Sequence, residues 1–288
     1  MNVYDIRMAP YWFYESRGLV QHPYVFRQPV SSRAIIASTH GDVTGDGVID
    51  EVFLTGNQML GSPLWRNITL VIRDGRTHQE QQIQLQNNMG YNPSLFLGDM
   101  TGDKIEDVAV VMDTGGSGGA IYAYVFAYLN RQFRRIFNSD VLNDELKYSV
   151  RYQNQYKASV ISHQQNETYI LDLTYKGREY LNEIYNSQGV LKMPIEGWVN
   201  PLSGLYPVDF DRDGVYELLV YQRIAGRYNA DSLGYVQTVL KWNGRRFAVV
   251  RQNVSIVGGA VSRNPDGCHP IKGDKTLQVF CNDNQIIR

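Results

Sequence analysis

The chain has 288 residues, of which 43% are hydrophobic and 12% aromatic, so it can bury a sizeable core and is not predominantly disordered. Its 28 basic and 29 acidic side chains give a formal net charge of −1, which excludes the basic surface that nucleic acids and anionic membranes select. The longest uncharged apolar run, 121–129, is about half of what a helix needs to cross a bilayer, so we expect no membrane span.

The first 30 residues are rich in aromatic side chains and carry no visible secretion signal. Asp5 and Arg7 lie within the first ten residues, and the following YWFYES is too short and too polar for the apolar core of a signal peptide. We expect residues 1–30 to form either an arm or a strand that closes the fold.

Three segments further along the chain share one pattern of side-chain oxygens. They are GDVTGDGVIDEVFL from Gly41, GDMTGDKIEDVAVV from Gly98 and VDFDRDGVYELLVY from Val208. Counted from the first aspartate, the oxygens recur at positions 1, 3, 5 and 9, in the sets Asp42, Thr44, Asp46, Asp50, then Asp99, Thr101, Asp103, Asp107, then Asp209, Asp211, Asp213, Glu217. Ca²⁺ takes roughly six to eight oxygen ligands, and the backbone carbonyls at position 7 would add to each set. The pattern predicts about three Ca²⁺ sites, with position 7 supplied by Val48, Ile105 and Val215.

The spacing resembles the start of an EF-hand but departs from it at position 12. Phe53, Val110 and Val220 stand there in place of a bidentate glutamate, and the flanks are β-branched and aromatic rather than helical. Each loop is therefore predicted at the tip of a β-hairpin. Lys104 replaces the turn glycine of the second loop and puts a positive charge beside it, so this loop is expected to be the weakest site. The alternative is that all three are plain polar turns.

Other strand pairs and one helix follow from local signals. Turns are predicted between strand-like runs at Asp74-Gly75, Asn130, Gln165-Asn166 and Asn243-Gly244, and a helix over 177–188. A last hairpin around Gly273-Asp274 could bring Cys268 and Cys281 face to face, either bonded or as free thiols.

The spacing of the acidic loops indicates a repeat architecture. The loops start at residues 42, 99 and 209, so they lie 57 and 110 residues apart, close to one and two periods of about 55. A degenerate unit without acidic ligands is expected around 156–174. Because each unit holds four antiparallel strands, we predict an all-β fold, a single domain over 1–288 that forms a β-propeller of about five four-stranded blades.

The loops and their flanking strands resemble FG-GAP/VCBS repeats, the calcium-loop β-propeller units of integrin α heads and many bacterial surface proteins. The phrase YNPSLFLGDMTGDKIEDVAVVMDTGGSGG is also similar to VCBS-type proteins of spore-forming Gram-positive bacteria. The resemblance implies calcium loops that stiffen the blades and a place outside the cell or on a cell or spore surface. Common members of that family have seven blades, and the resemblance implies no single activity.

Catalytic patterns are not evident in this sequence. The five histidines fall in different segments, GxSxG does not occur, and the glycine-rich segment 113–119 lacks the GK[ST] of a P-loop. That segment is expected either to connect blade strands or to line a ligand groove. A carboxylate pair for polysaccharide cleavage would have to come from Glu145, Glu179, Glu183 and Glu196, which the sequence does not pair.

The leading expectation is a non-enzymatic, calcium-stabilised β-propeller that serves as a structural, adhesive or protein-interaction module on a bacterial cell or spore surface. Its partner would be a protein or glycan at a propeller face, or further copies of the chain in a homo-oligomer or surface assembly. The alternative is a carbohydrate-binding or polysaccharide-cleaving protein, because propellers bind ligands at their faces and the fold does not settle function. A calcium-sensing regulatory domain ranks last.

Overall fold

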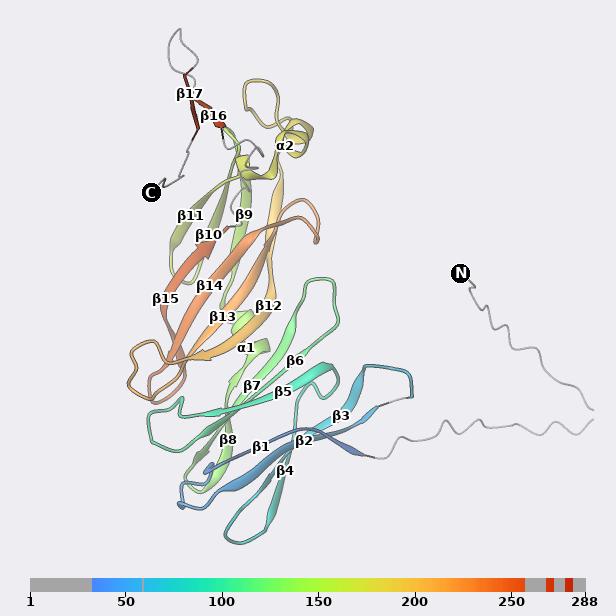
Figure 1. Cartoon of the computed structure of the whole chain (residues 1–288), viewed down its shortest axis with the longest axis vertical. Coiled ribbons are helices and arrows are strands. Elements are labelled where there is room, and N and C mark those ends of the chain that lie inside the picture. The colour runs from blue at the N-terminus through green and yellow to red at the C-terminus, as the bar shows by residue number, and fades with distance from the viewer. Residues whose placement is uncertain (1–32, 59, 257–267, 272–277, 282–288) are drawn as a thin grey trace, which may run out of the picture.

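The computed structural model describes residues 33–58, 60–256, 268–271 and 278–281. In these ranges the chain forms antiparallel β-sheets with two short helices and one 3-10 turn, which confirms the all-β prediction (Figure 1). The expectation for residues 1–30 lies outside the described residues.

The first two sheets are four-stranded meanders built in the same way. One contains, in order, β1 (Ala34–Gly41), β2 (Asp50–Gln58), β3 (Trp65–Arg73) and β4 (Glu80–Gln84). The other contains β5 (Tyr91–Gly98), β6 (Asp107–Asp113), β7 (Ile121–Leu129) and β8 (Gln132–Asn138). In each, an acidic loop joins the first strand to the second, and the turns predicted at Asp74-Gly75 and Asn130 are confirmed. Asn130 and Arg131 have φ values of 54° and 62°, as a tight hairpin turn requires.

A short helix, α1 (Ser139–Glu145), follows β8 and was not predicted. Asn138 is its N-cap, and the side-chain oxygen of Asn138 accepts a hydrogen bond of 2.9 Å from the backbone N–H of Asp140. The helix leads from the second sheet into the third.

The third sheet has seven strands, in the order β11-β10-β9-β12-β13-β14-β15. The bounds are β9 (Tyr148–Gln153), β10 (Lys157–Ser162), β11 (Glu167–Asp172), β12 (Glu196–Val208), β13 (Glu217–Ala225), β14 (Ser232–Trp242) and β15 (Phe247–Ser255). The hairpins predicted at Gln165-Asn166 and Asn243-Gly244 are both present. Helix α2 (Arg178–Ile184) lies within the span 177–188 where a helix was expected, and a 3-10 turn η1 (Thr174–Lys176) precedes it.

The period predicts a separate four-stranded blade in the middle segment, around residues 156–174, but the structure does not show one there. Glu196 and Gly197, at the start of the 13-residue strand β12, pair with β9, and from Trp198 onward the same strand pairs with β13. One sheet therefore continues through both units. It curls until β11 reaches β15, where the Tyr169 hydroxyl donates to the Gln252 carbonyl at 3.3 Å. The described residues thus show two four-stranded sheets, one nearly closed, barrel-like sheet of seven strands and one two-stranded sheet, not five separate blades.

Three apolar cores hold the sheets together. One lies between the first two sheets around Leu54, Leu70 and Val110, and another fills the barrel-like sheet around Val160 and Ile224. The remaining core joins the second sheet to the third.

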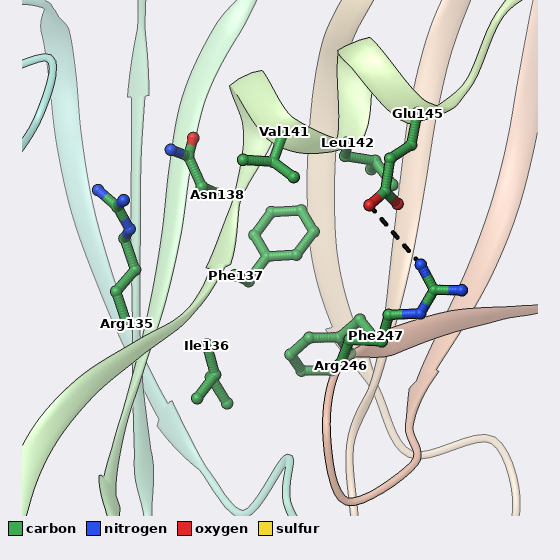
Figure 2. Close-up of a pocket in the computed structure, with 9 residues that line it drawn as sticks. All are labelled: Arg135, Ile136, Phe137, Asn138, Val141, Leu142, Glu145, Arg246 and Phe247. Carbon is green, nitrogen blue, oxygen red and sulfur yellow. Dashed lines mark ion pairs between the residues drawn. The ribbon is translucent and has the colours of Figure 1, made fainter.

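At the junction of the second and third sheets, Phe137 of β8 meets Phe247 of β15 edge to face at 5.8 Å. Figure 2 shows this junction beneath α1, where Glu145 and Arg246 form an ion pair at 3.7 Å. The sheets therefore lie in a row along the long axis of the molecule (Figure 1).

The last described strands are β16 (Cys268–Ile271) and β17 (Gln278–Cys281), which form the hairpin expected around Gly273-Asp274. Their register places Cys268 directly opposite Cys281. No helix in the described part of the chain is both long and apolar enough to cross a membrane.

A buried ion pair fixes α2 to the barrel-like sheet. The Asp231 carboxylate is 3% exposed and lies 2.6 Å from Lys176 Nζ, and it accepts hydrogen bonds from the hydroxyls of Tyr180 (2.7 Å) and Tyr152 (3.2 Å). Burial alone raises the pKa of Asp231, but the hydrogen bonds from Lys176, Tyr180 and the Arg227 backbone outweigh it and hold that pKa below its usual value.

Replacing this carboxylate tests the ion pair. Asp231→Asn leaves the Lys176 ammonium largely buried without a counter-charge, so we expect the free energy of unfolding at pH 7 to fall by about 3 kcal/mol. Because the folded-state pKa of Asp231 is depressed, its contribution is present above the unfolded pKa of about 3.9 and is lost as pH falls through the folded value. The gap between wild type and variant in urea titrations should therefore narrow below about pH 4.

The matched control is Glu196→Gln, which breaks the solvent-exposed pair with Arg151 and should have little effect. Equal effects of the two substitutions would contradict the role assigned to Asp231.

Candidate functional site

The three acidic loops stack on one another at one edge of the row of sheets. Loop one (42–50) joins β1 to β2, loop two (99–107) joins β5 to β6, and loop three (209–217) joins β12 to β13. The backbone N–H at position 8 of each later loop donates to the carbonyl at position 1 of the loop before it. These bonds run from Glu106 to Asp42 at 3.3 Å and from Tyr216 to Asp99 at 2.7 Å. The repeat seen in the sequence is therefore a physical row of loops.

Glycines in loops one and two leave room for the next loop of the row. A Cβ added to Gly45, at position 4, would lie 2.5 Å from Cδ1 of Ile105, and one added to Gly98, just before position 1, would lie 2.9 Å from the Tyr216 ring. Loop three has Val208 and Arg212 at the corresponding positions. No further loop stacks on it within the described ranges, so glycine is not required there.

Within each loop the first aspartate holds the turn. Its two carboxylate oxygens accept hydrogen bonds from the loop's own backbone, for example from Gly45 (2.7 Å) and Gly47 (2.8 Å) to Asp42. The equivalent bonds reach Asp99 from Gly102 and Lys104, and Asp209 from Asp213 and Gly214. At position 5, Asp46, Asp103 and Asp213 each accept from the N–H of position 7, that of Val48, Ile105 and Val215.

The acid at position 9 is buried beneath every loop. Asp50, Asp107 and Glu217 are 0%, 1% and 2% exposed. One oxygen of Asp107 accepts from the N–H groups of Met100 (2.8 Å) and Thr101 (2.9 Å). Burial, with the charges of Asp103 and Asp99 adding to it, outweighs these bonds and raises the pKa of Asp107 to about 7.

In loop three, a lysine side chain from the neighbouring strand β14 already pairs with the acids. Lys241 Nζ lies 2.7 Å from Glu217 Oε1 and 3.2 Å from Asp211 Oδ2, so it joins the acids at positions 9 and 3. Leu218 pairs with Leu240 across β13 and β14, which makes Lys241 the residue opposite Glu217.

The other two loops have no lysine in this place. By the same register, Asp74 lies opposite Asp50 and Ala127 lies opposite Asp107. Arg76 pairs with Asp46 of loop one at 2.5 Å, at position 5 rather than at the buried acid. Among the described residues, no cationic side chain forms an ion pair with the acids of loop two.

The residue at position 3 also distinguishes loops one and two from loop three. The hydroxyls of Thr44 and Thr101 are buried and have no hydrogen-bond partner in the described part of the chain, whereas Asp211 at the same position pairs with Lys241. Loops one and two thus combine an unpartnered hydroxyl at position 3 with a buried acid at position 9 that has no cationic neighbour in the described part of the chain. A bound cation would satisfy both, whereas Lys241 already pairs with the acids at these two positions in loop three. Loop two was expected to be the weakest site because of Lys104. In the described structure the side chain of Lys104 forms no ion pair with the acids of loop two, whereas Lys241 pairs with two acids of loop three.

The carboxylates of the described loops are not gathered into a compact cluster. Across residues 33–58 and 60–256, no three His, Cys, Asp or Glu side chains converge closely enough to hold a metal ion. A cation in loop one or two would therefore need the mixed set predicted from the sequence, in which a threonine hydroxyl and a backbone carbonyl join the carboxylates.

The glutamates considered for polysaccharide cleavage do not face one another in pairs. Glu145 pairs with Arg246 (Figure 2), Glu183 with Arg227 at 2.5 Å and Glu196 with Arg151 at 3.3 Å. Glu179 lies in the first turn of α2. The glycine-rich segment does line a groove, as one of its two interpretations predicts: Gly118 and Gly119 face three tyrosines of the third sheet. Sequence reasoning did not identify these tyrosines, because no motif connects them.

The stacking of the loops predicts that two neighbouring glycines differ in their tolerance of a side chain. Gly45 and Gly47 have φ values of 72° and 81°, so alanine at either position costs about 1 kcal/mol in backbone strain. Only Gly45 is covered by Ile105; nothing lies within 4 Å of a Cβ added to Gly47. We expect Gly45→Ala to lower the free energy of unfolding by about 1–3 kcal/mol more than Gly47→Ala in matched denaturant titrations. Equal losses would show that the loops do not stack.

Comparison with known proteins gives two matches. A family described as "YybI C-terminal domain" matches residues 146–255, the span of the seven-stranded sheet. A relative from Bacillus subtilis (strain 168), titled "Uncharacterized protein YybI", is 94% identical over 262 residues, which cover 91% of this chain and 100% of that protein. No solved structure matches the chain.

Proposed function

The chain belongs to the YybI family, and we propose that it is a cation-stabilised β-sheet module, not an enzyme, with a structural, adhesive or protein-interaction role on a bacterial cell or spore surface. The observation that carries the proposal is the row of stacked loops, in which the buried acids Asp50 and Asp107 face no cationic side chain from the described residues. The partner is a protein or glycan, or further copies of the chain.

The physical argument is the cost of burying a carboxylate. A charge taken out of water is strongly unfavourable unless it is paired, and in loop two the charges of Asp103 and Asp99 add to the cost of ionising Asp107. Ca²⁺ would remove that cost with oxygens that the loop already offers. Because the loops are joined by backbone hydrogen bonds, a cation in loop two would stiffen the contacts with both neighbouring loops.

The same row supports a propeller-type arrangement of the sheets. We infer that β1–β4, β5–β8 and β12–β15 are blades, since each is a four-stranded meander with an acidic loop after its first strand. A module of this kind provides rigid faces for binding. The resemblance of the loops to repeats of surface proteins supports the proposed location.

Calcium should stabilise the chain measurably. At a free Ca²⁺ concentration about 100 times the dissociation constant, each filled site adds about 2.7 kcal/mol, so the melting temperature should rise by several degrees relative to EDTA. Asp107→Asn should reduce that rise, because it removes the buried charge of loop two. The control Asp144→Asn changes a carboxylate that is 87% exposed and lies outside the loops, and it should leave the rise unchanged. An identical melting temperature in Ca²⁺ and EDTA for the wild type would refute the proposal.

Counting the bound ions tests the part assigned to Lys241. The sequence predicts about three Ca²⁺ ions, but the ammonium in loop three lowers our expectation to two, measured by native mass spectrometry. Lys241→Met should free Glu217 and Asp211 and raise the count by one. The control Lys147→Met removes an exposed lysine elsewhere and should not. Three ions in the wild type, or no gain in Lys241→Met, would contradict this assignment.

A further inference from the structure

A groove of about 410 Å³ lies where the β6–β7 loop of the second sheet reaches the seven-stranded sheet. Arg223 of β13 donates from Nη2 to the carbonyls of Ser117 (3.0 Å) and Asn229 (2.8 Å), and Asn229 Nδ2 donates to Ser117 Oγ at 2.7 Å. These bonds fasten the glycine-rich loop to the third sheet, so the groove is formed before any ligand binds.

Three tyrosines from adjacent strands line the groove. Tyr206 of β12, Tyr221 of β13 and Tyr235 of β14 meet edge to face, with ring centroids 5.6 Å and 6.2 Å apart. Tyr206 is 55% exposed. In the described structure none of the three hydroxyls has a hydrogen-bond partner, although those of Tyr148, Tyr152, Tyr175, Tyr180 and Tyr185 do. The groove therefore offers apolar ring surface together with free donors and acceptors.

Among the described residues that line the groove, Arg223 is the charged one and none is an Asp or Glu. Arg223 Nε is buried without a hydrogen-bond acceptor in the described part of the chain. Arg223 as a whole is only half-buried and lines the groove, so the charge of its guanidinium is available to a carboxylate on a ligand. The absence of acidic lining residues also means that the groove lacks the two carboxylates that glycoside hydrolysis uses, so binding is indicated rather than cleavage.

We propose that this groove binds an anionic saccharide, a sugar polymer that carries carboxylate groups. The apolar C–H face of a sugar ring packs on Tyr206, its hydroxyls bond with the free tyrosine hydroxyls and Ser203, and its carboxylate pairs with Arg223. Part of the groove is lined by glycine backbone, which leaves space for the sugar ring; these residues are Gly118, Gly119 and Gly204. This inference rests on the glycan-binding form of the proposed function, for which it names the ligand class and the site, and it does not depend on cations in the loops.

A proline-rich peptide is the competing occupant, since such peptides also dock on aromatic grooves. It would bury its rings against the tyrosines and would not need the positive charge of Arg223. The dependence of binding on ligand charge therefore separates the two.

The experiment is isothermal titration calorimetry of the full chain in EDTA, which prevents Ca²⁺ from bridging ligand and protein. The probes are an oligomer of galacturonic acid, an oligomer of galactose and a proline decapeptide. We expect the acidic oligomer to bind at least 10-fold more tightly than the neutral one. Tyr206→Ala should weaken its binding at least 10-fold, and Arg223→Lys should reduce the preference for the acidic oligomer.

The control variant is Tyr228→Ala, which removes a tyrosine of similar exposure (57%) outside the groove and should bind like wild type. Melting curves in EDTA confirm that each variant is folded. No binding of the acidic oligomer at millimolar concentration, equal binding of both sugars, or tighter binding of the peptide would overturn the inference. Calcium-independent melting would refute the proposed function and leave this result standing.

Discussion

The burial of one carboxylate beneath each acidic loop is the constraint on which the rest of the structure depends. Asp50, Asp107 and Glu217 are the first residues of β2, β6 and β13, the strands that follow the three loops, and each is almost completely removed from solvent. A buried acid has to be matched by hydrogen bonds and by positive charge. All three accept backbone N–H groups of their own loop, but within the described part of the chain only Glu217 also lies beside an ammonium group, that of Lys241.

The stacking of the loops connects the three sheets to which these buried acids belong. Loops two and three each donate a backbone hydrogen bond to the loop before them, and the apolar faces of the three sheets form the cores between them. The third sheet ends the row, and strands β9–β11 extend it into a barrel instead of adding another sheet. Its free tyrosines and Arg223 meet the glycine-rich loop of the second sheet, and the groove forms at that meeting point.

Much of the local structure could be predicted from the sequence, since it depends on residues close together in the chain. The acidic loops sit at hairpin tips as expected, because the turn chemistry of Asp and Gly and the flanking β-branched residues act locally. The blade count could not be predicted in this way. Whether β12 begins a new sheet or continues an old one depends on the pairing of Gly197 with Val150, nearly fifty residues earlier, and no local signal reports that pairing. Helix α1 was missed because its capping residue, Asn138, is also the last residue of strand β8, so no loop separates the strand from the helix.

By itself the sequence determined the all-β class, the three loops with their oxygens at positions 1, 3, 5 and 9, and the main hairpin turns. These features follow from residue type and spacing within about ten positions. Only the tertiary structure decided how the loops differ, because Lys241 reaches Glu217 through the register of β13 and β14 and not through any motif. The tertiary structure also brought Tyr206, Tyr221 and Tyr235 together with Gly118, since a groove exists only where separate strands and loops meet in space.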